Sequence, residues 1–554
     1  MTDAVADYDV VILGAGVNGA GLFRELTLQG LACLIVDKGD YGSGTSAAPS
    51  RLIHGGIKYL ETGEFRLVAQ STLERNLLLR NAPHCVEPLA TFIPSFSLMK
   101  GVTASLRTLF GSTTAPRSRG AILIKIGLAL YDFYGSRQRV MPKHRFFFRR
   151  QAMKEIPVIT PKIVAGGIYY DAKICRPERL VYELVADGIA AEPRSKALNN
   201  ATLEHRDGGV LTFRAADGGL HRARPTVVVN GAGPWIDQAN AALGVETRLI
   251  GGTKGSHIVI DHPELIKALD GRMIYFEADD GRICLVYDHL GLALVGSTDI
   301  KAANPDSVRI EDDEIDYFIG ALAALLPGLS FSRDSIVYAY SGIRPLPASD
   351  AANPGLISRD HSAPVIEPSG DRPFPILSLV GGKWTTFRGF AEEVCDTLLT
   401  RLGRARRLST RDLAIGGGRA YPAEGEAKRR WIAERARASG LAEAKVADLL
   451  FRFGTTADRV IAHIAATGGD RPLAHVRGVS AGEIDYIARN EQVVHLADIV
   501  LRRTTLAIEG LLTTEGLAEL ADIAAGALNW SAERRAEELA AVTARLTTVN
   551  RMRL

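Results

Sequence analysis

The chain has 554 residues, enough for about two to four domains with a large apolar core. Its composition, with 46% hydrophobic and 23% charged residues, is ordinary for a water-soluble globular protein. No apolar run reaches the roughly 18 residues of a membrane-spanning helix, and the net charge is only +3, so the sequence predicts neither an integral membrane protein nor a strongly charged one.

The cysteines predict neither a disulfide framework nor a metal site. They are scattered at Cys33, Cys85, Cys175, Cys284 and Cys395, and none forms a C-x-x-C pair. This usage suits the reducing cytoplasm. The first nine residues, MTDAVADYD, are acidic and lack the charged and apolar regions of a secretion signal, so we expect a cytoplasmic protein.

Positive charge is concentrated in one segment, which we call the basic segment. Residues 100–150 contain 11 Lys or Arg and a single acid, Asp132, which gives them a charge of +10. The rest of the chain therefore sums to −7. Within the basic segment, residues 122–134 are apolar enough to predict a helix.

In chain order, the first predicted elements form a strand, a glycine-rich turn, a helix and a second strand. They are an apolar run at 9–13, the motif G-x-G-x-x-G, a helical pattern at 20–29, and a second apolar run at 32–36 that ends in an acid. This combination within thirty residues predicts a dinucleotide-binding unit.

Each part of this unit has a physical role. Gly14 allows a tight turn, Gly16 allows the backbone to approach a pyrophosphate, and Gly19 allows the helix to pack closely on the strand. The start of the helix offers N–H groups to phosphate. Asp37 is placed to accept hydrogen bonds from the ribose hydroxyls.

The next segment favours FAD over NAD. Small and hydroxyl-bearing residues dominate 39–50 and predict a loop, which leads into LIHGGIKY at 52–59 and a helix over 64–79. Such a loop, directly after the ribose-binding acid, would lie beside the rest of a long cofactor.

The middle of the chain changes character. Residues 201–212 predict a hairpin, and alternating apolar and polar residues over 248–299 predict antiparallel sheet. A helix over 312–326 and strands over 335–340 and 376–380 follow. Beyond a linker at 403–422, amphipathic helices are predicted at 423–437, 442–453, 457–467, 481–502, 514–528 and 531–546.

The predicted fold class is α/β. It consists of a discontinuous Rossmann-like FAD-binding domain, an inserted mixed antiparallel-sheet substrate domain, and a C-terminal all-α domain. The predicted bounds are about 1–80, 165–247 and 335–402 for FAD binding, 81–164 and 248–334 for the substrate domain, and 423–554 for the helical domain.

Several motifs, taken together, resemble one family. They are GxGxxG, GTS…LIHGGxxYLExxEFRLV, VVVNGAGPW at 227–235, KGSHIV at 254–259, SGIRPL at 341–346, GGKWTTFR at 381–388 and LADIVLRRTT at 496–505. In this order they resemble the FAD-dependent (aerobic, respiratory) glycerol-3-phosphate dehydrogenases over roughly residues 8 to 510. The resemblance implies an enzyme that oxidises sn-glycerol 3-phosphate to dihydroxyacetone phosphate and passes electrons to membrane quinone.

The sequence departs from the family pattern in three segments, and in one of them, the loop AAPSR at 47–51, some of the usual serines are missing. Lys58 stands where the family usually has Arg, and residues 169–180, YYDAKICRPERL, replace the usual aspartate and alanine with Arg-Pro-Glu. A different polyol phosphate, such as erythritol phosphate, therefore stays open as the substrate. An oxygen-using oxidase and a non-catalytic flavoprotein module also stay open.

We expect tight, non-covalent FAD, since no covalent-attachment signature is recognisable. The residues predicted to bind it are Gly14, Gly16, Asn18, Gly19, Asp37, Thr45, Ser46, Gly231, Ala232, Gly233, Gly381, Gly382, Lys383, Thr385 and Thr386. The backbone N–H groups after Gly381 would face the flavin O2 at a helix start.

Oxidation of a carbinol also needs a base and a phosphate site. His54 and then His257 are the base candidates, because the unperturbed pKa of histidine lies near 6.5. Arg344 is the first choice for gripping phosphate, which arginine binds in bidentate fashion. The resemblance places Lys58, Tyr59 and Lys383 at the substrate as well, and Thr298 and Asp299 are expected to hold a turn nearby.

The basic segment predicts peripheral binding to the cytoplasmic membrane face. Its positive charge would attract anionic lipid headgroups, and Ile122, Leu123, Ile126, Leu128, Leu130 and Phe146 to Phe148 would supply apolar contact. The alternative is that these apolar residues pack in a core. Nucleic acid is not an expected partner, and a homodimer is left open.

Overall fold

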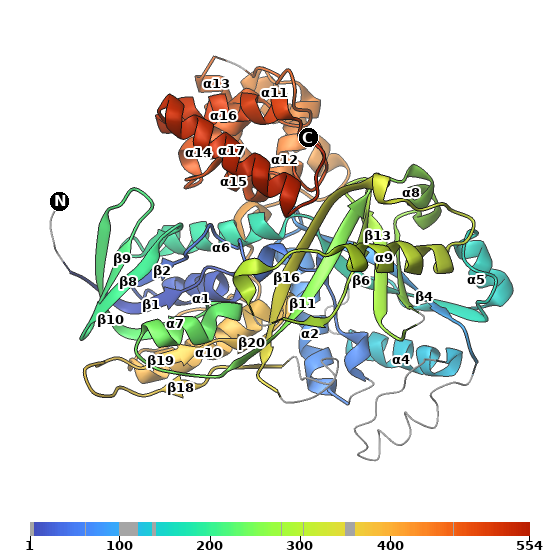
Figure 1. Cartoon of the computed structure of the whole chain (residues 1–554), viewed down its shortest axis with the longest axis horizontal. Coiled ribbons are helices and arrows are strands. Elements are labelled where there is room, and N and C mark those ends of the chain that lie inside the picture. The colour runs from blue at the N-terminus through green and yellow to red at the C-terminus, as the bar shows by residue number, and fades with distance from the viewer. Residues whose placement is uncertain are drawn as a thin grey trace.

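The computed structural model describes residues 5–60, 63–98, 120–135, 140–278, 280–302, 304–349, 360–468 and 470–554, without the side chain of Lys58. Part of the basic segment, including residues 100–119, therefore lies outside the described residues. Two large sheets lie side by side, and the C-terminal helices lie together on one side of both (Figure 1).

The first sheet has eight described strands and begins with the predicted dinucleotide-binding unit. Its order is β18 (Val365–Ile366), β19 (Ile376–Ser378), β10 (Leu220–Asn230), β1 (Ala6–Leu13), β2 (Cys33–Val36) and β7 (Lys196–Leu198), with β9 (Val210–Arg214) and β8 (Thr202–Asp207) added beyond β10. Strands β19, β10, β1, β2 and β7 are parallel. Strand β2 and the C-terminal halves of β1 and β10 are buried apolar runs because both faces of the sheet are covered. Helices α1 (Val17–Leu28), α6 (Pro177–Ala191) and α10 (Phe387–Arg401) pack together on one of these faces.

The second sheet has ten described strands. Its path is β15 (Ile300–Lys301), β11 (Ile250–Ile260), β14 (Leu292–Gly296), β13 (Ile283–His289), β12 (Arg272–Glu277), β4 (Val86–Ser95), β6 (Ala165–Ile174) and β3 (Leu52–Ile53), with β16 (Ile336–Pro347) on β11 and β5 (Arg145–Phe148) on β6. All pairs except β12 with β4 are antiparallel. The alternation at 248–299 is thereby confirmed as antiparallel sheet.

The predicted domain bounds need a correction at two strands. The ranges predicted for FAD binding begin at 165 and 335, yet β6 and β16, which start there, both pair within the second sheet. An apolar run shows that a strand is buried but not which partner it pairs with, so the sequence assigned both strands to the wrong sheet.

The remaining helices surround the sheets. They are α2 (Phe65–Asn81), α4 (Ala121–Tyr134), α5 (Arg149–Glu155), α7 (Ile236–Ala242), α8 (Pro263–Leu269) and α9 (Asp312–Leu325). A short pair, β17 (His361–Ser362) and β20 (Val380–Gly381), leads into α10. No helix in the described part of the chain has both the length and the apolar character needed to cross a membrane.

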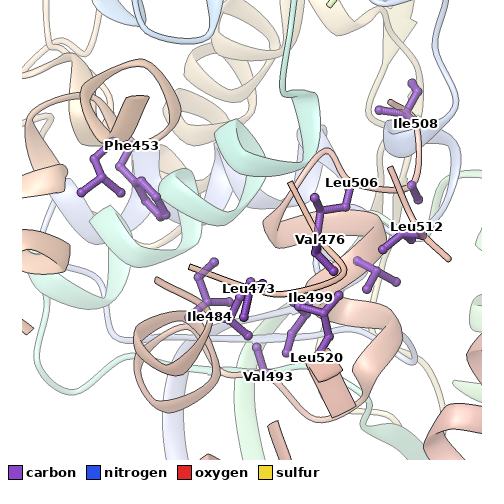
Figure 2. Packing of buried hydrophobic residues seen from close by; sticks show 14 of the residues in the cluster. Phe453, Leu473, Val476, Ile484, Val493, Ile499, Leu506, Ile508, Leu512 and Leu520 are labelled. Atoms are coloured by element: carbon purple, nitrogen blue, oxygen red, sulfur yellow. The ribbon is translucent and has the colours of Figure 1, made fainter. Parts of the chain in front are cut away.

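The C-terminal region consists of α11 (Glu426–Ser439), α12 (Glu443–Phe453), α13 (Ala457–Ala466), α14 (Ala481–Asn490), α15 (Leu496–Asp498), α16 (Thr514–Leu528) and α17 (Ala532–Thr548). Figure 2 shows part of its core, from Phe453 to Leu520. The same core continues into the second sheet through Val259, Tyr287 and Tyr338. The helical region is therefore packed onto the second sheet.

One predicted helix is divided in the structure. Residues 481–502 were expected to form one helix, but α14 ends at Asn490 and Gln492 takes a left-handed φ of +51°. The helix resumes at Leu496 and passes into a π-helical turn, Ile499–Arg503. Tertiary contacts override the periodicity here, because Glu491 forms a bidentate ion pair with Arg179 at 2.7 and 2.8 Å.

Candidate active site

The glycine turn after β1 is crowded in the way the sequence predicts. Gly14 has a φ of +98°, and its N–H donates to the carbonyl of Val36 at 2.7 Å. A β-carbon at Gly19 would lie 2.0 Å from the carbonyl oxygen of Gly14. Any side chain at Gly19 would therefore separate α1 from the strand.

The hydroxyl-rich loop lies against the start of α1. The N–H of Val17 donates to the Ser46 hydroxyl at 2.9 Å, and the Thr45 hydroxyl donates to the carbonyl of Ile343 at 2.5 Å. The indole N–H of Trp384 donates to the carbonyl of Ser46 at 3.1 Å. This loop therefore joins the glycine turn to β16 and to the GGK motif.

Asp37 lies at the end of β2, half-buried beside the glycine turn. Its carboxylate accepts hydrogen bonds from the N–H groups of Ala15 at 2.6 Å and Gly39 at 2.9 Å. Burial raises the pKa of Asp37 to about 6, although these two hydrogen bonds oppose the rise. Ribose hydroxyls would add further donors to the same carboxylate.

The segments 227–235 and 381–388, which we call the second and third flavin motifs, meet the first, the G-x-G-x-x-G turn at 14–19. Gly231 donates to the carbonyl of Leu13 at 2.8 Å, and a β-carbon at Gly14 would lie 2.6 Å from the Gly231 oxygen. Asn18 donates to the carbonyl of Gly381 at 3.4 Å. Gly381 and Gly382 have φ values of +73° and +86°, which glycine adopts readily.

These residues fit FAD. Three glycine turns meet beside the start of α1, where the helix dipole has its positive end. The Asn18 Oδ1 atom is buried and has no hydrogen-bond partner among the described residues. A buried amide oxygen without a donor is costly, so a bound ligand that supplies one is physically favoured.

A first cluster of predicted catalytic residues gathers beside the GGK motif. The His54 N–H donates to the Thr385 hydroxyl at 3.1 Å, and the rings of His54 and Tyr59 lie 6.2 Å apart. The Lys383 ammonium lies 4.0 Å from the centre of the Tyr59 ring and donates to the Ser71 hydroxyl at 2.9 Å. The structure thus brings His54 and Lys383 to the same aromatic ring, that of Tyr59.

A second cluster surrounds His257, which is buried on β11. Its Nε2 atom lies 2.8 Å from the Ser50 hydroxyl, and its ring stacks on Tyr340 at 4.8 Å. Burial lowers the pKa of His257 well below the ordinary value, and the charges of Arg344 and Arg51 lower it further. The imidazole is therefore neutral, and its buried Nδ1 has no partner among the described residues.

Arg344 is held in place before any substrate binds. It donates to the Asp299 carboxylate at 3.1 Å, to the Thr298 carbonyl at 3.1 Å and to the Ser297 hydroxyl at 2.9 Å. A β-carbon at Gly255 would lie 2.2 Å from this guanidinium, so the glycine makes room for it. A phosphate at Arg344 would therefore share the guanidinium with Asp299.

Sequence reasoning missed several residues at these clusters. Ser50, Ser71 and Tyr340 contact the predicted residues, but each comes from a segment without its own chemical signature. Ser50 was counted only as part of a small-residue loop. Its bond to a histidine 207 positions away has no local signal in the sequence.

The described residues contain one group with the spacing of metal ligands. His84, Cys85 and Glu183 are buried, and their ligand atoms lie within 4.8 Å of one another. His84 Nε2 and Glu183 Oε2 are 2.8 Å apart and already pair through a hydrogen bond. We assign no metal to them.

Known proteins are similar to this chain over most of its length. The family model described as FAD dependent oxidoreductase matches residues 9–396, and the model described as C-terminal domain of alpha-glycerophosphate oxidase matches residues 408–535. Glycerol-3-phosphate dehydrogenase from Synechocystis sp. is 32% identical over 525 residues, which cover 90% of this chain and 89% of that protein. The chain belongs to the FAD-dependent glycerol-3-phosphate dehydrogenase family.

The chain is also similar to two further proteins. D-erythritol 1-phosphate dehydrogenase from Brucella abortus is 30% identical over 393 residues, which cover 69% of this chain and 72% of that protein. The structure of glycerol-3-phosphate dehydrogenase from Bacillus halodurans complexed with FAD superimposes with a TM-score of 0.73 at 21% identity, and covers 98% of this chain and 95% of that chain. The predicted fold class, the FAD cofactor and the assignment as an FAD-dependent oxidoreductase are confirmed.

Proposed function

We propose that this dehydrogenase oxidises sn-glycerol 3-phosphate to dihydroxyacetone phosphate. The main support for this proposal is that His54 and Lys383 both lie near the Tyr59 ring, beside the third flavin motif. The chain is also 32% identical to a glycerol-3-phosphate dehydrogenase. The chemistry that bound FAD supplies is the acceptance of a hydride from the carbinol carbon.

The chain's own residues supply the proton acceptor and the charge. As the hydride leaves the carbon, the hydroxyl proton must pass to a base, and half-buried His54 is our first candidate. His257 is the second, because its neutral ring can accept a proton although its pKa is low. Lys383, held by Ser71 and the Tyr59 ring, supplies positive charge at the same turn.

The substrate phosphate carries about two negative charges near neutral pH. We assign it to Arg344, with Lys58 and Lys383 as further cations. The guanidinium is oriented by Asp299 and Thr298, so less side-chain entropy is lost on binding.

Arg344→Ala is expected to reduce kcat/KM for the phosphorylated substrate by about 10- to 150-fold, or about 1.5–3 kcal/mol, because a charged hydrogen bond to phosphate is lost. Steady-state rates with an artificial dye as acceptor measure this. FAD content should be unchanged, and Arg333→Ala, an exposed arginine on a short helix, is the control. An Arg344→Ala enzyme with wild-type kcat/KM would remove Arg344 from the phosphate site.

Erythritol phosphate is the second candidate substrate, favoured by the match to D-erythritol 1-phosphate dehydrogenase and by Lys58. Dye-linked assays with glycerol 3-phosphate and the tetritol phosphates, run side by side, decide between them. Higher kcat/KM for glycerol 3-phosphate supports the first proposal, and higher kcat/KM for a tetritol phosphate supports the second.

We also propose that electrons leave to a membrane quinone, and that the enzyme binds the cytoplasmic membrane face through α4 and its neighbours. Twelve large hydrophobic side chains are exposed in the described residues, and eight of them lie between residues 96 and 148: Phe96, Leu98, Ile122, Ile126, Leu130, Phe133, Val140 and Phe148. Phe133 and Phe148 are 71% and 72% exposed. Such a concentration of apolar surface supports a lipid-facing patch.

Helix α4 has one exposed face and one buried face, and both carry apolar residues. Ile122, Ile126 and Leu130 recur at four-residue spacing on its exposed face, while Leu128 is buried on the other. Leu128 and Phe147, both expected at the lipid, instead pack in the core. Figure 1 places α4 on the opposite side of the molecule from the C-terminal helices.

Binding to anionic vesicles that weakens with added salt is expected for the wild-type enzyme. Changing Arg145, Arg149 and Arg150 together to Glu should weaken binding by at least about 100-fold, at roughly 1 kcal/mol per charge near the surface. Vesicle flotation measures this, and Arg429→Glu with Arg430→Glu, on the exposed side of α11, is the control. If the triple arginine variant binds the vesicles as strongly as the wild-type enzyme, the patch is not the membrane contact.

The electron acceptor needs its own measurement, because oxygen is the alternative to quinone. Turnover that requires a soluble quinone analogue and consumes little oxygen supports the proposal. Oxygen consumption at the full rate of turnover would identify an oxidase instead.

A further inference from the structure

The turn that carries His54 is held at its backbone by a buried cluster from outside the flavin motifs. The N–H of Gly55 donates to the Tyr131 hydroxyl at 2.9 Å and to the Asp171 carboxylate at 3.0 Å. A β-carbon at Gly55 would lie 2.3 Å from that hydroxyl and 2.5 Å from a methyl group of Thr72. The turn therefore packs so closely against the cluster that no side chain larger than that of glycine fits at position 55.

The cluster is a closed set of charges and hydrogen bonds. The Tyr131 hydroxyl donates to Asp171, and Arg75 Nη1 donates to the Tyr131 oxygen at 2.8 Å and to Asp171 at 3.0 Å. The side chains of Arg75 and Asp171 are 4% and 1% exposed, and Tyr131 is 2% exposed. A buried ion pair with this many bonds fixes geometry more than it adds net stability.

The three residues come from three different elements. Arg75 lies on α2, Tyr131 on the inward face of α4 and Asp171 on β6. Helix α2 also carries Ser71, which binds the Lys383 ammonium at 2.9 Å. One rigid group of elements therefore contacts both His54's turn and Lys383.

His54 is constrained from the other side by Thr385, whose hydroxyl accepts the His54 N–H at 3.1 Å and reaches the His54 carbonyl at 3.3 Å. Thr385, which belongs to the third flavin motif, thus holds the backbone of His54, and the Tyr131 hydroxyl holds the N–H of Gly55. A shift of the Gly55 N–H would move the imidazole relative to the flavin site.

We propose that Tyr131, with Asp171 and Arg75, is a positioning residue that holds the turn of His54 in its reactive geometry. The proposal rests on the function proposed above for this site. In this proposal Tyr131 contacts neither the cofactor nor the substrate, and it acts through its hydrogen bond with the N–H of Gly55. Misplacement of a reacting group by about 1 Å can cost about 100-fold in rate.

The test is Tyr131→Phe in the full-length, FAD-loaded enzyme, with anaerobic rapid mixing and glycerol 3-phosphate. The limiting rate of flavin reduction at saturating substrate should fall by about 10- to 100-fold. The substrate concentration giving half the limiting rate, the FAD content and the thermal midpoint should stay near wild type. A folding role alone would change FAD content and midpoint together with the rate.

Tyr169→Phe is the matched control, because Tyr169 is equally buried and packs edge-on against Tyr131 at 5.4 Å. It should keep the wild-type rate. Should Tyr131→Phe fail to fold, Arg75→Lys keeps the charge, loses the planar fork and is expected to show the same rate-only defect.

Tyr131→Phe at the wild-type rate, or an equal loss in Tyr169→Phe, would overturn this inference. A wild-type enzyme whose flavin is not reduced by any polyol phosphate would instead overturn the proposed function. The two failures are therefore distinguishable in one set of experiments.

Discussion

His54→Ala is expected to slow flavin reduction by about 10²- to 10⁴-fold, the range for loss of a general base. The imidazole is half-buried beside Tyr59 and Lys383, and its main chain is bonded to Thr385. Removing the ring should therefore leave the turn and the bound FAD in place. Anaerobic stopped-flow spectroscopy at saturating substrate measures the rate directly.

Comparing the rates of flavin reduction in His54→Ala and His257→Ala shows which of the two histidines is the base. His205→Ala, an exposed histidine on β8, is the control and should reduce at the wild-type rate. If His257→Ala alone shows the large loss, the neutral buried ring is the base. If neither variant is slow, the proton goes to water or to another group, and the assignment to histidine fails.

Asp40→Asn is expected to lower the free energy of unfolding by about 3–5 kcal/mol, the cost of breaking a buried ion pair. Asp40 accepts hydrogen bonds from Arg502 at 2.9 Å and from Arg503 at 2.8 Å, and the Asp40 and Arg503 side chains are completely buried. Without the carboxylate, Arg503 would keep a buried charge with less compensation. Thermal and denaturant unfolding measure the loss.

The ion pair of Asp40 with Arg502 and Arg503 also makes the free energy of unfolding fall at acidic pH. Burial alone would raise the pKa of Asp40, but Arg503 and Arg502 outweigh it and lower the pKa to about 2. The stabilisation is therefore present above the unfolded pKa of about 3.9 and is lost as the pH falls from about 4 towards 2.

The control is Asp412→Asn, because Asp412 pairs with Arg80 at the surface, where such pairs are worth about 0–1 kcal/mol. Equal stability of Asp40→Asn and Asp412→Asn would contradict the account. Asp40 lies three residues after Asp37, so Asp40→Asn should also weaken FAD retention if the C-terminal helices fix the ribose-binding loop.

The sequence predicted the elements whose signal is local. The helix at 514–528 has the predicted bounds, and the hairpin predicted over 201–212 is the pair β8 and β9, which turns at Gly208. Both depend on residues close in sequence, namely a 3.6-residue apolar period and a glycine turn. The three flavin motifs converge as expected because glycine marks backbone that must approach closely.

The rest depends on contacts between distant residues. Arg503 and Asp40 are 463 positions apart, and Gly55 meets Tyr131 across 76 positions, so neither pair has a local pattern. The apolar run of α4 predicted a helix but not which face is buried. Its inward face carries a tyrosine whose hydroxyl only the tertiary structure brings to the active-site turn.

The most direct test of the central claim is anaerobic titration of the purified FAD-loaded enzyme with sn-glycerol 3-phosphate, followed by flavin absorbance. We expect complete loss of the oxidised flavin band, with formation of one dihydroxyacetone phosphate for each flavin reduced. A flavin band that persists at saturating glycerol 3-phosphate, while dithionite still reduces it, would contradict the account.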